Sequence, residues 1–327
     1  MTHPRTALIT GVSGQDGIYL ARALLADGLR VVGTVSPSGD GGARTRLYAP
    51  GTELVTLDIR DAAALGELVA GVRPDEIYHL AAFSSVGGSW VQPELAFACN
   101  TAPVGTLLEA VVALGREGHA VRMFQASSAE TLGGKSPYAE SKRRAAELVA
   151  EARREHGVLA SVGTLFNHES PLRGEQFVTR KITRAAAAIA LGLADSVTLG
   201  SLDVSRDWGH AGDYVGAMRA SLAHDEPVDV QIGTGVVHTL GELVETAFAA
   251  AGLADAASYV VHDPALVRPA DVAVSVADPR PAAQELGWTA AVTFEQLVQQ
   301  MVDVDLLRAK TGVEDDPAYL DLGFVRT

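Results

Sequence analysis

Tyr138 and Lys142 are four residues apart near the start of a helix predicted over 138–156. Residues at i and i+4 share one helix face, so the phenol and the ammonium should lie side by side. A phenol with a pKa of about 10 is a poor base at neutral pH, but a neighbouring ammonium favours its phenolate. Ser128, just after a predicted strand, could hydrogen-bond the same substrate hydroxyl. The pattern indicates removal of a hydroxyl proton as hydride leaves the same carbon, although Tyr-x-x-x-Lys pairs also occur by chance.

A hydride acceptor needs a binding site, and the sequence GVSGQDG (11–17) lies between the first predicted strand and the first predicted helix. Glycines there permit a tight turn and close backbone approach to a pyrophosphate, whose charge the helix N-terminus favours. A plain glycine turn is the alternative, but dinucleotide binding demands this strand–turn–helix context. The predicted cofactor-binding residues here are Gly11, Gly14, Gln15, Asp16 and Gly17, joined by Tyr138 and Lys142.

Two more strand ends carry candidate cofactor contacts. Asp58 and Ile59 follow the third predicted strand, where a carboxylate could accept a hydrogen bond from the adenine amino group. Leu80, Ala81 and Ala82 end the fourth, where small residues let a dinucleotide lie close. Each alone could equally be structural, but ligands of open parallel sheets bind at the carboxyl edge of successive strands.

The choice between NADP and NAD depends on the residues after the second predicted strand. Thr34-Val35-Ser36 contains no acidic residue to hold a ribose 2′-hydroxyl. This absence favours NADP, whose 2′-phosphate Arg44 or Arg46 could reach. The alternative is that both arginines are solvated loop charges, with NAD as the cofactor.

Short apolar runs alternate with longer helical patterns through the first half of the chain. The apolar runs lie at 7–10, 30–33, 54–57, 76–81, 122–127 and 159–166, and the helical patterns near 17–27, 61–71, 95–115 and 138–156. The stretch between the second and third runs, rich in Gly, Ser and Pro, is predicted to be a loop. Apolar strands alternating with helices predict an α/β fold with a Rossmann-type doubly wound parallel sheet, covered on both faces and joined by right-handed crossovers.

After Asn167 the alternation fades. Helical patterns at 177–192, 211–223, 240–252 and 294–309 are separated by short strands and proline-marked turns. We therefore expect a Rossmann domain over 1–166, completed by returning segments from the second half, and a smaller C-terminal α/β substrate-binding cap formed mainly by 167–327.

Composition excludes several classes of partner. The 40 acidic side chains exceed the 26 basic ones, giving a formal net charge of −14, and so negative a surface repels nucleic acid and anionic membranes. The N-terminus lacks the apolar stretch and cleavage site of a signal peptide, and the apolar run at 185–194 is too short to span a bilayer. Cys99 is the only cysteine, which fits a reducing compartment. We expect a cytoplasmic location, and no metal site is predicted.

Seven blocks of sequence carry a resemblance to known enzymes: ALITGVSGQDGIYLA, DEIYHLAAFSSV, QASSAE, SPYAESK, LFNHESPLRGEQFVTRKI, SLDVSRDWGHAGDY and DPALVRPADV. The chain resembles the extended short-chain dehydrogenase/reductases and, among them, most resembles the GDP-mannose 4,6-dehydratase family. The similarity covers nearly the whole length, and the Asn-His-Glu-Ser-Pro and Arg-Asp-Trp-Gly-His blocks are uncommon outside that family.

The resemblance implies a hydro-lyase and gives Glu130 a role that a simple reductase does not need. In this family, oxidation at C4 of a nucleotide-linked hexose acidifies the C5 proton, a carboxylate removes that proton, and hydroxyl leaves from C6. The hydride then returns to C6, leaving a 4-keto-6-deoxy sugar. By resemblance Glu130 is this base and later an acid, and Ser128, Tyr138 and Lys142 complete the catalytic set. The alternative is that Glu130 is an exposed loop carboxylate.

The family's substrate-binding residues carry over where the blocks match. Asn167 would contact the phosphates of the sugar nucleotide, GDP-mannose or a relative. Lys181, Arg206 and Arg268 would neutralise the diphosphate, as an acidic enzyme with an anionic substrate requires. Each of these cations could instead be a structural ion-pair partner.

Other residues of the matching blocks are assigned less sharply. Ser84 and Ser85, after the fourth predicted strand, would line the sugar pocket. His168 and Glu169 could equally touch substrate or pack in the cap. Trp208 is expected, with His210, to support the segment that carries Arg206.

The sequence departs from the family at two places. Ser36 and Pro37 replace paired arginines that help hold the NADP phosphate and join subunits. The resemblance therefore leaves both the choice of cofactor and the formation of a tetramer open. The segment TLGGKSP (131–137) replaces a longer loop that helps to wall the sugar pocket, although two glycines still allow a sharp reversal. Ser128 itself stands where the family usually has Thr, which keeps the hydroxyl.

Three functions are compatible with these observations. The leading hypothesis is a GDP-mannose 4,6-dehydratase-like lyase with bound NADP. A reductase or epimerase of a nucleotide-linked keto sugar is the alternative, and a non-catalytic protein that binds cofactor or sugar nucleotide is the third. By resemblance, the helices at 95–115 and 138–156 would pair across a two-fold axis in a homodimer or homotetramer.

Overall fold

The computed structural model describes residues 5–266 and 273–322, which form two compact units. The first unit contains the described residues up to Leu165 together with Tyr214–Ile232 and Pro279–Thr289, and the second contains the remainder. The helical pattern at 211–223, expected in the cap, therefore contributes most of its length to the first unit. The chain returns there because Val215 and Met218 on this helix pack in the same core as the sheet.

A parallel sheet organises the first unit, with the strand order β11-β6-β5-β4-β1-β2-β3. The strands are β1 (Thr6–Thr10), β2 (Arg30–Val35), β3 (Glu53–Thr56), β4 (Glu76–His79), β5 (Arg122–Ser128), β6 (Leu159–Leu165) and β11 (Asp229–Ile232). The chain order reverses between β1 and β4, which are neighbours in the sheet. This arrangement confirms the predicted doubly wound fold and places the switch point, where such sheets bind ligands, after β1 and β4.

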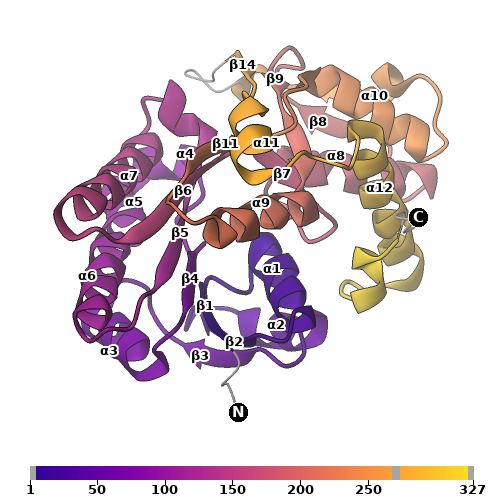
Figure 1. Cartoon of the computed structure of the whole chain (residues 1–327). Coiled ribbons are helices and arrows are strands. Elements are labelled where there is room, and N and C mark those ends of the chain that lie inside the picture. Colours follow the sequence, from indigo (N-terminus) through magenta and orange to yellow (C-terminus); the bar gives the residue numbers. More distant parts are fainter. Residues whose placement is uncertain (1–4, 267–272, 323–327) are drawn as a thin grey trace. The chain divides into compact units, whose positions relative to one another are not determined.

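Both faces of the sheet are covered by helices because its strands are apolar on both sides. Ala7 and Ile9 of β1 pack in one core with α1 (Gln15–Ala26), α9 (Ala211–Ala223) and α11 (Arg280–Leu286). Leu8 between them packs in the opposite core, whose helices are α3 (Ala62–Val72), α6 (Ala102–Arg116) and α7 (Pro137–His156). Figure 1 shows α3, α6 and α7 on one side of the sheet and α1 on the other.

The single helix predicted near 95–115 is wrong, because two helices cover this stretch. They are α5 (Pro93–Asn100) and α6, separated at Thr101. Pro103 has no N–H to continue the first helix and suits the first turn of the second. The break also lets Asn100 and Thr101 bond to Ser141 of α7, over 2.9 Å each. Residues 93–116 are long and apolar enough to span a bilayer, but their apolar positions include core residues of this unit.

The loop predicted after the second strand contains a helix, α2 (Gly41–Tyr48). Its sequence has little helical signal of its own. Tyr48 is 2% exposed, and the Thr45 hydroxyl donates to the Gly41 carbonyl over 2.8 Å. Burial of its last turn therefore stabilises a helix that local propensity does not predict. The remaining helix of this unit, α4 (Val86–Val91), follows β4.

Three helices form the core of the second unit: α8 (Val178–Ala190), α10 (Leu240–Ala250) and α12 (Phe294–Thr311). Short strands pair beside them: β7 (Asn167–Glu169) with β10 (Trp208–His210), β8 (Val197–Leu199) with β13 (Val260–His262), and β9 (Ser205–Arg206) with β12 (His238–Thr239) and β14 (Val274–Ser275).

A buried ionic cluster joins two of these helices. Arg180 of α8 and Arg308 of α12 both bind the Asp305 carboxylate, and all three side chains are almost fully buried. Each guanidinium also donates to the Pro171 carbonyl, over 3.0 and 2.9 Å. The cluster therefore fixes the segment that follows β7, because breaking one partner of a buried ion pair leaves an uncompensated charge.

Candidate active site

Steric contacts require glycine at the turn after β1. Gly11 has a φ of +73°, and a Cβ there would lie 2.8 Å from the Ala81 Cα. A Cβ on Gly17 would lie 2.6 Å from the Gly11 carbonyl oxygen. Gly14, the exposed N-cap of α1, provides no side-chain cap to the first helical amides. The turn therefore fits the pyrophosphate of a dinucleotide, which accepts from such amides at a helix N-terminus.

Neighbouring strands bring the predicted cofactor contacts to the same sheet edge. The amides of Leu80 and Ala81 donate to the carbonyl and the hydroxyl of Thr10, over 3.2 Å each. Ala81 thereby packs against Gly11, where a larger side chain would collide. Ala82 next to it is exposed. Gln15 and Asp16 lie in the first turn of α1.

The Asp58 carboxylate is bound by a residue that the sequence interpretation missed. The Arg60 guanidinium donates to both carboxylate oxygens, and hydrogen bonds from its side chain and backbone lower the pKa of Asp58 to about 2. Asp58 is therefore ionised and already holds a cation, while Ile59 packs against the sheet core. The signal in the sequence was the Asp-x-Arg spacing, which allows a local fork-to-carboxylate pair. Contact of Asp58 with adenine stays a prediction.

The two arginines predicted to reach a 2′-phosphate lie on α2. Arg44 is half-buried, with its guanidinium carbon 6.0 Å from the ring centre of Tyr48. Arg46 is exposed in the last turn. Both are cations beyond the end of β2, as the NADP hypothesis requires.

Tyr138 and Lys142 lie in the first turns of α7, which begins at Pro137 with Ser136 as its N-cap. Both side chains are buried, at 8% and 4% exposure. The Lys142 ammonium donates to the Ala126 carbonyl of β5 over 2.9 Å, and burial lowers its pKa to about 8. The ammonium thus stays largely protonated at neutral pH, one helical turn from the phenol. A fixed positive charge there favours the phenolate that proton abstraction needs.

Ser128 and Glu130 follow β5 directly. Ser128 caps a 3₁₀ turn, η1 (Ala129–Leu132), and its hydroxyl accepts from the Glu130 amide over 3.3 Å. Glu130 is half-buried, and its carboxylate lies over Gly134, where a Cβ would be 2.7 Å from Oε2. The side chain is thus partly covered, and the catalytic role of Glu130 stays a prediction. The hydrogen bond from Lys142 to the Ala126 carbonyl joins the start of α7 to the end of β5. The four predicted catalytic residues lie on these two segments, Ser128 at the end of β5, Glu130 just after it, and Tyr138 and Lys142 on α7.

The two serines after β4 have different surroundings. Ser85 is the N-cap of α4, and its hydroxyl accepts from the Gly88 amide over 2.9 Å. Ser84 lies directly before this N-cap residue, is exposed, and does not itself cap α4. Ser85 therefore has a structural role in addition to any contact with a sugar.

Within the second unit, strand pairing sets the place of two predicted substrate ligands. Asn167 of β7 is opposite Trp208 of β10, and Arg206 lies two residues before Trp208 on β9. Lys181, exposed in the first turn of α8, donates to the Thr198 carbonyl over 2.6 Å. Arg268 lies outside the described residues. Lys181 and Arg206 are both cations of this unit, and their contact with a diphosphate stays a prediction.

Asp207 is a further residue that the sequence interpretation missed. It is fully buried beside Arg206 and accepts four hydrogen bonds. Their donors are the Thr234 amide and hydroxyl, the Gly235 amide and the Ala277 amide, over 2.6 to 3.2 Å. One carboxylate therefore joins the strand that carries Arg206 to two other segments. Asp207 lies between Arg206 of β9 and Trp208 of β10, and a fully buried carboxylate is stable only when it is hydrogen-bonded.

The remaining residues of the matching blocks have supporting contacts. Trp208 stacks on Phe294 with ring centres 6.0 Å apart, and burial lowers the pKa of His210 to about 4. Glu169, 2% exposed, binds Arg173 over 2.9 Å and accepts from Thr179 over 2.7 Å. These contacts favour packing over substrate contact for Glu169.

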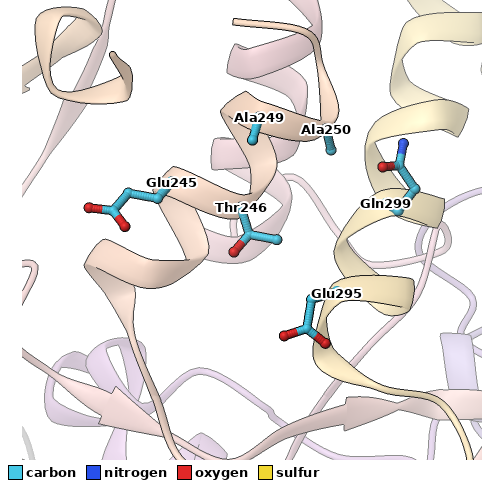
Figure 2. A pocket seen from close by; sticks show the side chains of 6 residues that line it. All are labelled: Glu245, Thr246, Ala249, Ala250, Glu295 and Gln299. Carbon is cyan, nitrogen blue, oxygen red and sulfur yellow. The ribbon is translucent and has the colours of Figure 1, made fainter. Parts of the chain in front are cut away.

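A separate hollow of about 500 Å³ lies between α10 and α12, and no predicted site residue lines it. Figure 2 shows its lining residues, Glu245, Thr246, Ala249 and Ala250 on α10 and Glu295 and Gln299 on α12. Two carboxylates and no cation line this space, so a sugar diphosphate would be repelled there.

Comparison with known proteins decides the family. The family model described as GDP-mannose 4,6 dehydratase matches residues 8–301. The chain belongs to the GDP-mannose 4,6 dehydratase family.

Relatives in this family align over nearly the whole chain. GDP-mannose 4,6 dehydratase 2 of Arabidopsis thaliana is 39% identical over 343 residues, covering 97% of this chain and 91% of the relative. The GDP-mannose 4,6-dehydratase of Yersinia enterocolitica is 39% identical over 356 residues, covering 94% and 95%. Both aligned lengths exceed the 327 residues of this chain, so the alignments contain positions that it lacks.

Solved structures with the same fold include relatives outside the GDP-mannose 4,6 dehydratase family. The UDP-glucose 4-epimerase of Thermus thermophilus, in complex with NAD, is 26% identical with a TM-score of 0.80. The match covers 94% of this chain and 100% of that chain.

Proposed function

We propose that this chain is a GDP-mannose 4,6-dehydratase, a hydro-lyase that converts a nucleotide-linked hexose to its 4-keto-6-deoxy form. The observation that carries this proposal is the grouping of Ser128, Glu130, Tyr138 and Lys142 at the end of β5 and the start of α7. A carbonyl reductase needs a tyrosine, a lysine and a serine, but its reaction does not require removal of the C5 proton of the sugar. Glu130 supplies the additional base, and the curated relatives are dehydratases at 38–39% identity.

The cofactor in this proposal is a nicotinamide dinucleotide held at the turn after β1. The turn at Gly11, Gly14 and Gly17 would hold this cofactor, which would supply a hydride acceptor for C4 of the hexose and a hydride donor for C6, so that the reaction would have no net redox change. The close backbone contacts at Gly11 and Gly17 keep the turn before α1 tight, and the related epimerase structure holds NAD. We propose NADP, because Thr34-Val35-Ser36 at the end of β2 contains no acidic residue and α2 presents Arg44 and Arg46.

The side chains then have distinct tasks. Tyr138 removes the C4 hydroxyl proton, and the Lys142 ammonium stabilises the phenolate that does so. Ser128 hydrogen-bonds the same oxygen. Glu130 removes the C5 proton that the new C4 ketone acidifies and then protonates the C6 hydroxyl as it leaves. As hydride returns at C6, Tyr138 gives its proton to C5, so Tyr138 and Glu130 both finish in their starting protonation states and one water is released per turnover.

The diphosphate of the substrate is held by residues of the second unit. Arg206 and Lys181 provide charge-assisted hydrogen bonds, and the side-chain amide N–H of Asn167 donates a further hydrogen bond. Asp207 fixes the strand of Arg206, so the cation is presented on an ordered segment.

We also propose a homodimer or homotetramer. Its support is apolar surface at Trp90 and Phe97 of α4 and α5, 55% and 36% exposed, which light scattering of the purified protein can test.

One assay tests the function. The purified protein is incubated with GDP-mannose and trace NADP while product mass and nicotinamide absorbance are followed. Loss of one water without accumulation of NADPH is expected. Stoichiometric consumption of NADPH on a keto sugar would instead indicate a reductase, and no conversion of either substrate would indicate a binding protein.

The Glu130→Gln variant tests the decisive residue. It should bind cofactor normally but release no water, because an amide cannot take the C5 proton. Glu147→Gln, an exposed carboxylate of α7 that pairs with Arg144, is the matched control and should retain turnover. Unchanged turnover in Glu130→Gln would refute the assigned role.

A further inference from the structure

We propose that Arg143 is a positioning residue, which holds the short segment after Glu130 so that the Glu130 carboxylate faces the sugar. This inference rests on the proposed dehydratase function. Arg143 follows Lys142 directly on α7, but its side chain extends towards the 3₁₀ turn rather than towards the buried ammonium site. It has no role in the sequence-based hypothesis, since the family resemblance assigned nothing to it.

One guanidinium connects α7 to Thr131 of the 3₁₀ turn and to Gly134, two residues beyond its end. Arg143 Nη1 donates to the Thr131 carbonyl over 3.1 Å and to the Gly134 carbonyl over 3.0 Å. Its Nε and Nη2 donate to Glu140 Oε2 over 3.0 and 2.7 Å. The ion pair with Glu140 orients the Arg143 guanidinium. Its two hydrogen bonds to the carbonyls are charge-assisted and therefore stronger than hydrogen bonds between neutral groups. Arg143 therefore binds the backbone one and four residues after Glu130.

The turn needs such an external anchor because its own sequence orders it poorly. Gly133 and Gly134 lose more backbone entropy on ordering than other residues. Within the turn, the Gly134 amide donates to the Glu130 carbonyl over 2.8 Å and the Thr131 hydroxyl to the Ser128 carbonyl over 2.7 Å. The segment 131–137 has only seven residues before Tyr138. Side-chain contacts from α7 thus substitute for the packing that a longer loop would provide itself.

The position of Gly134 bears directly on the Glu130 carboxylate. A Cβ on Gly134 would lie 2.7 Å from Glu130 Oε2 and 2.6 Å from the Glu130 carbonyl oxygen. The carboxylate therefore rests on the Gly134 backbone, whose carbonyl Arg143 holds. A general base must lie within hydrogen-bonding distance of its proton, and an error of about 1 Å can cost roughly 10²-fold in rate. Arg143 acts on C5 deprotonation through this contact.

The neighbouring Arg144 provides a matched control. It lies on the same helix with similar exposure, but its hydrogen bonds go to Glu147 and Glu151 on α7 itself. Arg143→Met removes the bonds to the Thr131 and Gly134 carbonyls while keeping the aliphatic stem. Arg144→Met removes only two surface ion pairs, which are worth little to stability. Arg143→Lys keeps the charge but loses the fork that reaches both carbonyls.

The first measurement needs no ligand. Amide hydrogen exchange of the purified protein should show faster exchange at Gly134 in Arg143→Met, with no change in Arg144→Met and an intermediate rate in Arg143→Lys. Equal exchange at Gly134 in wild type and Arg143→Met would overturn the proposal. Thermal unfolding of the same samples shows whether the whole domain, rather than the turn, has been destabilised.

The second measurement separates positioning of Glu130 from general damage. With GDP-mannose and NADP, kcat for water loss in Arg143→Met should fall by roughly 10²-fold with KM little changed. The nicotinamide absorbance change on mixing, which reports C4 oxidation by NADP with Tyr138 as the base, should persist, and exchange of the C5 proton with solvent deuterium should slow. Equal loss of C4 oxidation and C5 exchange would refute a role through Glu130. If the wild-type protein releases no water, the proposed dehydratase function is refuted. The hydrogen-exchange result still decides whether Arg143 holds the segment at Thr131 and Gly134.

Discussion

Replacement of Gly134 by alanine gives a direct test of how the Glu130 carboxylate is held. The added Cβ would lie 2.7 Å from Glu130 Oε2, whereas ordinary van der Waals contact begins at 3.4 Å. The carboxylate would have to retreat by about 0.7 Å, which is the difference between these distances. The Glu130 carbonyl oxygen, 2.6 Å from the same Cβ, is backbone and cannot rotate away. The turn itself must therefore move together with the base.

The expected effect is kinetic first and structural second. A displacement of this size should lower kcat for water loss by about 10- to 100-fold, which corresponds to roughly 1.4 to 2.7 kcal/mol of transition-state stabilisation. Crowding at the turn should also lower the free energy of unfolding by about 1 to 3 kcal/mol. KM for the sugar nucleotide should change little, because its diphosphate ligands are elsewhere.

Gly133→Ala is the matched control, since no atom lies within 4 Å of its added Cβ. The assay is steady-state kinetics with GDP-mannose and NADP for wild type and both variants, combined with denaturant unfolding. Wild-type kcat in Gly134→Ala would refute the contact between the turn and the base. Equal loss in Gly133→Ala would mean that any added side chain disrupts the turn, and the steric reasoning would then fail.

Two buried groups give further predictions about stability. Burial and then the nearby Lys142 charge lower the pKa of His79 from its ordinary value to about 3. The unfolded chain therefore binds more protons below pH 6.5, so stability should fall with decreasing pH from about 6.5, by up to roughly 1.4 kcal/mol per unit from this group. His79→Gln should reduce that slope in denaturant unfolding between pH 6.5 and 5, and an unchanged slope would exclude His79 as its source. Asp207→Asn replaces one acceptor oxygen by a donor and leaves two donors unpaired among Thr234, Gly235 and Ala277, which should cost about 2 to 5 kcal/mol of unfolding free energy. Exposed Asp203→Asn is its control, and equal stability of the two variants would contradict the role of Asp207 as a buried anchor.

Much of the fold was predictable because its signals are local. Six apolar runs in the first half match the six strands found there, since strands covered on both faces are mostly apolar, although His79 and Gln125 are buried in them as well. Helices without such a signal were missed or misjudged. The helix α2 depends on burial of Tyr48, and the break between α5 and α6 depends on Pro103 together with contacts to Ser141. The return of α9 and β11 to the sheet is a long-range choice that no window of sequence reports.

The sequence by itself determined the residue types and spacings that chemistry needs: the glycines after β1, the Tyr138–Lys142 pair on one helix face, and a carboxylate two residues beyond Ser128. These are set by steric limits and helical periodicity, which act between near neighbours. Only the tertiary structure decided what surrounds them. It buried Asp207 among donors from distant segments and set Arg143 across the turn that supports Glu130. Hydrogen bonds between segments depend on backbone positions that exist only after packing, so no local pattern encodes them.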